Sequence, residues 1–277
     1  MEELTGNSVS GHLRLRCEVR EDGVPFLAEQ SFRAPVHLSK PHVDAGCLVV
    51  SVVNPTAGFF DGDSLVSEVE VCSGAKLVMS TPAASRVFRT RSGKAAVNRQ
   101  KFSVAAGGFF EWIPEAFIPH AGANYEQRTE IELEAGAGLL FVDWISPGRV
   151  ARGEVFEYER LRWELDLKVD GRLMARERYE MRGAGDGLEG IKAMFEAGHY
   201  VSVYVAGRMI DAWPGAELDK LGGEDVYMGH GRLEGSVMVL RALCRDSLAA
   251  RGLVEKSRAL LYGNAGMTVP NLGRIFM

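Results

Sequence analysis

The sequence has few cysteines, no long apolar run and no excess of positive charge, and each lack excludes a class of protein. Its four cysteines, at positions 17, 47, 72 and 244, form no C-x-x-C pair and match no zinc module, so we expect reduced, buried thiols. No stretch of about 18 residues is both apolar and uncharged, which argues against a transmembrane helix. The net charge of −5 and the pI of about 5.8 argue against binding to duplex nucleic acid.

Common catalytic and metal-binding signatures are also missing. The sequence contains no H-E-x-x-H, G-x-S-x-G, Walker A or complete EF-hand pattern. Its acidic N-terminus has no apolar signal core, so we expect a cytoplasmic protein that binds no membrane. A composition of 46% hydrophobic and 25% charged residues excludes a disordered, collagen-like or coiled-coil chain. The 277 residues suffice for one large domain or two small ones.

Residues 1–182 are dominated by strand patterns. Residues 12–20 and 161–169 alternate strictly between apolar and charged side chains, which predicts half-buried strands. The short apolar runs 48–53 and 139–142 fit strands that are buried on both faces. We therefore predict a mainly β fold over this part of the chain.

Glycine-containing turns punctuate these strands at intervals of 29 to 35 residues, at positions 73–74, 107–108, 136–138 and 170–171. Recurrence at such a period indicates a β-helix-like stack of β-hairpin units. Residues 183–277 differ. Helical spacing is expected over 188–197, over 209–221 with an interruption near Pro214, and over 246–261, and strands are expected over 200–205 and 237–243. In the last helix Leu248, Leu253, Val254, Ser257 and Leu261 are expected on one side. Because no linker rich in proline, serine or charge divides the sequence, we expect a single α+β domain over residues 1–277.

Two carboxylates interrupt apolar patterns. In residues 173–181 the alternation places Glu177 on the apolar face, and Asp143 lies between the apolar segments 139–142 and 144–145. A buried carboxylate must be paired, protonated or bound to a cation. Glu177 is therefore either part of an internal salt bridge or a polar group lining a cavity, and Asp143 is either a structural acceptor or a site residue.

Two further motifs carry weaker signals. Asp61 and Asp63 lie two apart in an acidic turn, which suggests a calcium loop; a structural turn is the favoured interpretation for Asp61 and less clearly so for Asp63. Gly185, Gly187 and Gly190 form a literal G-x-G-x-x-G after a strand, the pattern of a dinucleotide-binding turn. The preceding strand is charged on one face, unlike a buried parallel strand, so a glycine-rich turn is the simpler interpretation.

Five ordered segments together resemble the UreD (UreH) family of urease accessory proteins. They are RAPVHLSKP at 33–41, VVNPTAGFFDGD at 52–63, TPAASRVFR at 81–89, WIPEAFIPHAGA at 112–123, and DWISPGR at 143–149 followed by Gly153-Glu154. One departure is that family members often have Gly-Gly-Asp where this chain has Asp61-Gly62-Asp63, which leaves Asp61 as an extra acid. The tail matches the family only loosely.

The resemblance implies a non-catalytic scaffold or chaperone with a β-helix-like fold. Such a protein would bind apo-urease and an F-type accessory protein, and through the latter a G-type GTPase. Its role would be to help insert nickel into the urease metallocentre, with Ni(II) held only transiently and no tightly bound cofactor.

An internal route for nickel should use carboxylate, hydroxyl or water ligands, because clusters of thiolate and imidazole would hold Ni(II) too tightly to release it. Matching the family residue by residue, we expect Asp63, Ser85, Asp143 and Glu177 to line this route. Second-tier candidates are His37, Glu115 and His120, with Arg86 and Arg89 as possible partners of the acids. Two alternatives stay open: a small-molecule enzyme that uses the Gly185 turn, and an interaction module that only bridges partners.

Overall fold

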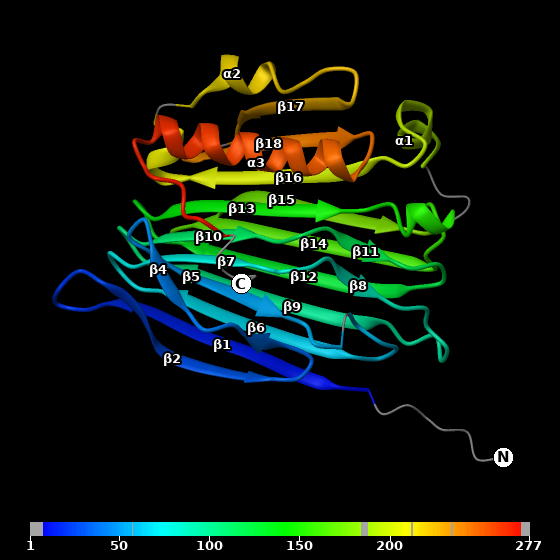
Figure 1. Cartoon of the computed structure of the whole chain (residues 1–277), viewed down its shortest axis with the longest axis horizontal. Helices are drawn as coiled ribbons and strands as arrows, with labels where there is room; N and C mark the ends of the chain where they lie inside the picture. Colours follow the sequence, from blue (N-terminus) through cyan, green and yellow to red (C-terminus); the bar gives the residue numbers. More distant parts are fainter. Residues whose placement is uncertain (1–7, 57, 184–187, 212, 234, 273–277) are drawn as a thin grey trace.

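The fold is built from two β-sheets that face each other (Figure 1). The computed structural model describes residues 8–56, 58–183, 188–211, 213–233 and 235–272. The smaller sheet has seven strands, in the order β15 (Arg172–Met181), β14 (Arg160–Val169), β12 (Asn124–Leu133), β9 (Ala96–Val104), β6 (Ser64–Val71), β1 (Ser10–Val19) and β2 (Pro25–Arg33).

The larger sheet has eleven strands. Its main order is β17 (Val226–Arg232), β18 (Val237–Cys244), β16 (His199–Ala206), β13 (Gly138–Ile145), β10 (Phe109–Ile113), β7 (Lys76–Ser80), β5 (Cys47–Val53) and β3 (His37–Leu38). Three short strands join its side: β4 (His42–Asp44), β8 (Ser85–Val87) and β11 (Phe117–Pro119).

The chain winds as a solenoid, alternating between the sheets from β6 to β14. Strands β6, β9, β12 and β14 pair in parallel in the smaller sheet, and β5, β7, β10 and β13 pair in parallel in the larger one. The β-helix-like prediction is thereby confirmed. The two strands of most repeat units lie in opposite sheets, so a unit such as β6–β7 is an arch, whereas β14–β15 is an antiparallel hairpin.

The corner turns stack on one another, which explains their even spacing. The Ser73 hydroxyl donates to the Ala106 carbonyl at 2.7 Å, and the Ala106 amide donates to Glu134 at 2.8 Å. One coil further, the Ala135 amide donates to Asp170 at 2.9 Å. Each side chain thus satisfies the backbone of the adjacent coil, a substitute for the ladder hydrogen bonds that end at the corner.

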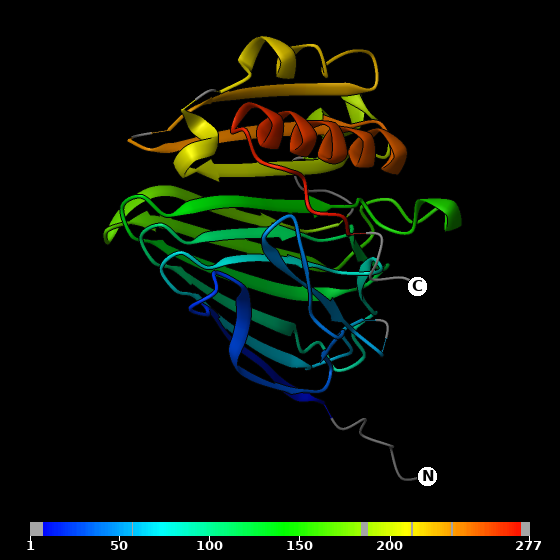
Figure 2. The same cartoon turned by 60° about the vertical axis from the view of Figure 1, so that its left-hand side comes forward.

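The C-terminal third adds antiparallel strands and most of the helical structure. Strands β16, β18 and β17 extend the larger sheet, and α3 (Ser247–Asn264) lies across its outer face (Figure 2). The shorter helices are α1 (Glu189–Met194) and α2 (Gly215–Asp219), with 3₁₀ turns at Val150–Arg152 and Gly207–Ile210. No helix among the described residues is long and apolar enough to cross a membrane.

One expectation about the C-terminal helices needs correction. Leu248 is not on the buried side of α3: it is 78% exposed, because the Asp246 side chain caps the helix and residue 248 falls in the outward part of the first turn.

The second helical segment, 209–221, is expected to break near Pro214. The predicted interruption is present: a 3₁₀ turn ends at Ile210 and α2 begins directly after Pro214, where proline cannot donate to the preceding turn.

Residues 185–187 of the glycine-rich turn lie outside the described residues, and of its three glycines only Gly190, inside α1, is described. The strands on either side, β15 and β16, belong to different sheets, and β16 pairs antiparallel with both of its neighbours. A dinucleotide-binding turn requires a β-α-β unit with parallel strands in one sheet. The dinucleotide interpretation is therefore wrong.

Two apolar cores result from this arrangement. The first lies between the two sheets and includes Phe102, Phe141 and Leu165. The second lies between the larger sheet and α3 and includes Val203, Leu240 and Leu253. The polar groups described next belong to the first core, so they lie in the interior of the solenoid.

Candidate functional site

A row of polar side chains crosses the inner face of the smaller sheet. Strands β9 and β12 carry amides and a hydroxyl at inward positions where the rest of each strand is apolar. The register places Gln127 beside Asn98, Thr129 beside Gln100, and Ser67 on the other side of Gln100. We call Ser67, Asn98, Gln100, Gln127 and Thr129 the polar row; all of them are at most 9% exposed.

Hydrogen bonds connect most of this row. The Asn98 amide donates to Gln127 Oε1 at 3.3 Å, and the Tyr125 hydroxyl donates to the same oxygen at 3.0 Å. The Thr129 hydroxyl donates to Gln100 Oε1 at 3.0 Å. The side-chain oxygen of Asn98, Oδ1, has no hydrogen-bond partner among the described residues. A buried acceptor without a donor can receive one from water or contact a cation.

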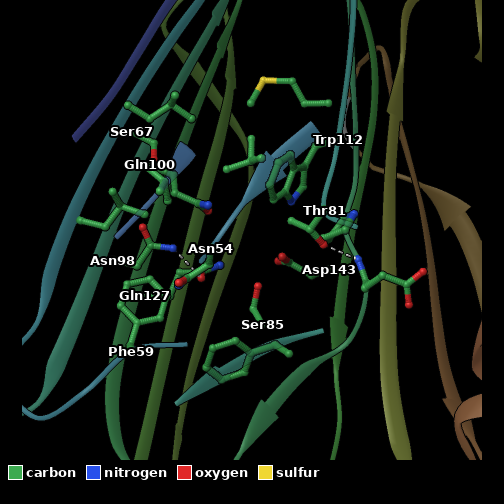
Figure 3. Close-up of a pocket in the computed structure, with 18 of the residues that line it drawn as sticks. Asn54, Phe59, Ser67, Thr81, Ser85, Asn98, Gln100, Trp112, Gln127 and Asp143 are labelled. Atoms are coloured by element: carbon green, nitrogen blue, oxygen red, sulfur yellow. Dashed lines mark hydrogen bonds between the residues drawn. The ribbon is translucent and has the colours of Figure 1, made fainter. Parts of the chain in front are cut away.

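A cavity of about 80 Å³ lies against the polar row. The larger sheet and its connecting loops contribute Asn54, Thr81, Ser85 and Asp143 to the lining, and Figure 3 shows Thr81, Ser85 and Asp143 across from the polar row. Aromatic side chains complete the lining, Trp112 and Trp163 among them. A space of this size can hold a few water molecules, since each needs about 10–15 Å³ by this measure.

Asp143 links the two sheets within this space. Strand β13 places the carboxylate inward, where it is 5% exposed, and the Trp163 indole donates to its Oδ2 at 3.1 Å. Burial, with a smaller contribution from the negative charge of Glu177, raises the pKa of Asp143 to about 7 against the lowering effect of the Trp163 hydrogen bond. Asp143 can therefore exchange a proton for a cation near neutral pH.

Glu177 does not line this cavity but lies in the neighbouring part of the interior. Strand β15 buries it to 8% exposure, as the alternation predicted. Its carboxylate forms an ion pair with Arg241 on β18 and accepts a hydrogen bond from the Tyr179 hydroxyl. Tyr179 in turn contacts the Tyr200 hydroxyl at 2.8 Å. Of the two interpretations given by the sequence, the structure shows the internal salt bridge.

The carboxylates of Asp63 and Asp61 accept hydrogen bonds from backbone amides, and neither side chain lines the cavity. Asp63 is 2% exposed and accepts from the amides of Val9 at 2.7 Å and Phe60 at 2.8 Å. Asp61 accepts from Thr90 and from the amides of residues 91 and 92. Burial acts in the opposite direction, but these hydrogen bonds lower the pKa of Asp61 to about 2. The two acids face different partners and form no shared calcium loop.

Of the second-tier candidates, Glu115 lines the cavity and His120 is buried without contributing to its wall. Glu115 also pairs with Arg251 of α3 at 2.6 Å. His120 is 7% exposed, its Nε2 has no partner among the described residues, and burial together with the Arg149 charge lowers its pKa. His37 is exposed and packs edge-on against Phe32.

The two arginines proposed as partners of the acids lie elsewhere. Arg86 and Arg89 are exposed, and neither forms an ion pair within the described ranges. The guanidinium that does meet an interior acid belongs to Arg241, which the sequence alone did not single out. The polar row was also missed, although a signal existed: Asn98 and Gln127, like Gln100 and Thr129, are 29 residues apart, the same interval that separates two of the corner turns.

The interior offers oxygen ligands and few others. No group of three or more His, Cys, Asp or Glu side chains gathers in the described part of the chain. All four cysteines are free, and burial raises the pKa of Cys47 to about 11, so its thiol stays protonated. Amide, hydroxyl and carboxylate oxygens bind divalent transition metals more weakly than thiolate and imidazole do.

The fold and its interior together define a two-sheet solenoid protein with a buried polar row. Comparison with known proteins names its family. The sequence model described as UreD urease accessory protein matches residues 9–274. The chain belongs to the UreD family, as the five segments indicated.

Individual relatives agree. The chain is 40% identical over 263 residues to a protein of Opitutus terrae named urease accessory protein UreD, covering 91% of this chain and 94% of that one. A protein of the same name from Actinomyces naeslundii is 30% identical over 258 residues, covering 92% of this chain and 94% of its own. A third, from Acetivibrio thermocellus, is 26% identical over 257 residues.

Proposed function

We propose that this chain is a non-catalytic scaffold that helps deliver Ni(II) to apo-urease through its polar interior. Its relatives are named urease accessory proteins, and membership of their family supports a role in urease maturation. The observation that carries the finer proposal is the polar row, which gives the space between two apolar sheets a chain of oxygen ligands.

The chemistry of the interior suits transient passage. An ion that moves through a protein needs ligands strong enough to replace part of its water and weak enough to release it. The row supplies neutral oxygens, the cavity has space for water that stays on the ion, and Asp143 provides one carboxylate. Glu177 lies one strand beyond Trp163, since β15 pairs with β14. Ser85 and Asp143 line the proposed route, whereas Asp63 stabilises a loop near it.

The proposed partners are apo-urease, an F-type accessory protein and, through the latter, a G-type GTPase in the cytoplasm. Co-expression of this chain with the F-type protein and apo-urease tests the scaffold role directly. We expect the three to elute together at a fixed stoichiometry. A lone chain that ignores both partners would contradict the proposal.

Deletion of the gene tests the role in maturation. The deletion strain should produce urease apoprotein that is inactive and low in nickel, and the chain supplied from a plasmid should restore activity. Fully active urease in the deletion strain would refute the proposed function. A bridging module without an ion route remains the second candidate, and it differs in the effect of interior carboxylate variants.

A further inference from the structure

The Glu177 carboxylate already has a cation bound to it. Its Oε1 pairs with the Arg241 guanidinium, and its Oε2 accepts from the Tyr179 hydroxyl, so both oxygens are occupied. The two side chains differ in exposure: 11% for Glu177 and 46% for Arg241. The acid therefore belongs to the interior, while its partner reaches it from the solvent side.

The strand register shows how Arg241 reaches the interior. Asp143 on β13 pairs with Ser202 on β16, and Ser202 pairs with Arg241 on β18. Directly paired residues on neighbouring strands project from the same face of a sheet. Asp143, Ser202 and Arg241 thus form one line on the inner face, from a buried carboxylate to a half-exposed guanidinium. Glu177 meets the outer end of this line.

The Arg241 guanidinium has open space on the side of the neighbouring strand β17. On β17 the residue paired with Arg241 is Gly229, which has no side chain. A Cβ atom added at Gly229 would meet no other atom within 4 Å, so the space beside Arg241 is open. No side chain on β17 therefore covers Arg241 at this register position.

The surroundings of Glu177 also contain a second phenol. Tyr204 is fully buried, and its hydroxyl lies beside the Glu177 carboxylate. Burial raises the pKa of Tyr204, and the nearby Glu177 charge raises it further, so the phenol stays neutral. A cation at Glu177 would find this hydroxyl as an additional neutral ligand.

We propose that Arg241 is a built-in, displaceable counter-ion that occupies the Glu177 carboxylate until a divalent cation replaces it. The proposal rests on the interior ion route proposed above. The guanidinium keeps the buried acid paired, as a buried charge requires, and excludes monovalent cations, which carry no more charge than the arginine does. A divalent ion carries twice that charge and can displace it, so the pair would set both the affinity and the selectivity of this end of the route.

The test is Ni(II) binding to the purified full chain, measured by calorimetry with nickel sulfate. Arg241→Gln should tighten binding about tenfold, a change of about 1.4 kcal/mol, because the competing cation is gone. The double variant Arg241→Gln/Glu177→Gln should lose that gain. The matched control is Arg176→Gln on the outer face of the same strand as Glu177, where Arg176 pairs with Asp166; it should bind nickel as the wild type does.

Arg241→Lys provides a second measurement in case the glutamine variant does not fold. It keeps a positive charge beside Glu177 but loses the planar fork, so its nickel affinity should lie between those of the wild type and the glutamine variant. The proposal is overturned if Arg241→Gln and Arg241→Lys both bind nickel as the wild type does, or if the gain persists in the double variant.

Urease activation in cells separates this proposal from the function on which it rests. If Arg241→Gln tightens nickel binding while Glu177→Gln activates urease normally, the counter-ion assignment holds and the ion route through Glu177 fails. If nickel affinity does not change while Glu177→Gln abolishes activation, the ion route holds and the counter-ion assignment fails.

Discussion

The indole nitrogen of Trp163 on the smaller sheet donates a hydrogen bond of 3.1 Å to the carboxylate of Asp143 on the larger sheet. Trp163 is paired in register with Gln127 of the polar row on one side and with Tyr179 on the other. This single contact therefore connects the polar row, the interior carboxylate and the neighbourhood of Glu177.

Replacing Asp143 with asparagine should change how stability depends on pH. The folded pKa is raised from the ordinary value of 3.8 to about 7, so the folded chain keeps a proton that the unfolded chain releases. The resulting stability is complete below about pH 4 and is lost as the pH rises toward 7, by up to about 1.4 kcal/mol per pH unit. Asp143→Asn removes this loss and keeps an oxygen for Trp163.

The measurement is urea unfolding of both proteins at several pH values between 4 and 8. His199 adds a dependence of the opposite sign: burial lowers its pKa to about 4, and its contribution is lost as the pH falls below about 6.5. Subtracting the two curves cancels this effect, because both proteins contain His199. A difference that stays constant over this range would show that Asp143 is ionised in the folded chain.

The attachment of α3 to the larger sheet depends on one buried ion pair. Glu111 is fully buried and accepts from Arg258 at 2.5 and 2.9 Å and from the Tyr262 hydroxyl at 2.5 Å. Glu111→Gln leaves the guanidinium without its counter-charge and should lower the free energy of unfolding by about 3–5 kcal/mol. The exposed pair Arg14–Glu68 is the control, and Arg14→Gln should cost less than about 1 kcal/mol. Equal effects in denaturant unfolding would contradict this account.

The polar row should be sensitive to loss of its central amide. Gln127→Leu removes the acceptor for both Asn98 and Tyr125, and each unsatisfied buried donor costs about 1–3 kcal/mol. Gln30 on β2 is exposed, so Gln30→Leu should change stability by no more than about 0.5 kcal/mol. A neutral or stabilising Gln127→Leu would mean that the row is already satisfied by water, and the midpoint of urea unfolding decides between these results.

Two glycine-to-alanine substitutions should change the free energy of unfolding in opposite directions. Gly207 follows β16 with φ of +74°, and a Cβ atom there would lie 2.6 Å from the Ala137 carbonyl oxygen, so Gly207→Ala is expected to cost at least about 1–2 kcal/mol. Gly252 lies inside α3 with open space around it, and Gly252→Ala should gain about 0.5–1 kcal/mol. Thermal unfolding of both variants tests the pair, and a stabilising Gly207→Ala would contradict the geometry.

Local pattern was enough to predict much of the fold. Strict alternation identified β1 and β14, apolar runs identified β5 and β13, and evenly spaced glycine turns indicated the solenoid. These features depend on neighbours in the chain or on repetition along it. Strand β17 was missed because two of its residues are glycines and its side chains are only partly buried.

The interior site was only partly predictable, because its contacts are non-local. Alternation placed Glu177 inside, but Arg241 is 64 residues away and reaches it only after β18 has joined the larger sheet. Asp63 is buried as a carboxylate lining a route would be, yet both of its oxygens accept from backbone amides, one from Phe60 in the same turn and one from Val9 next to β1. Tertiary packing decides whether a buried acid accepts from backbone amides or faces the cavity. Packing of this kind leaves no local pattern in a single sequence.

The most direct test of the ion route is nickel-dependent activation of apo-urease by complexes purified with wild-type, Asp143→Asn or Glu177→Gln chains. The two variants should assemble with the F-type protein and apo-urease at the wild-type stoichiometry, since both residues lie inside the chain. Urease activity and its nickel content should nevertheless fall at least tenfold. Assembly with full activation by both variants would contradict the route and leave a protein that only bridges its partners.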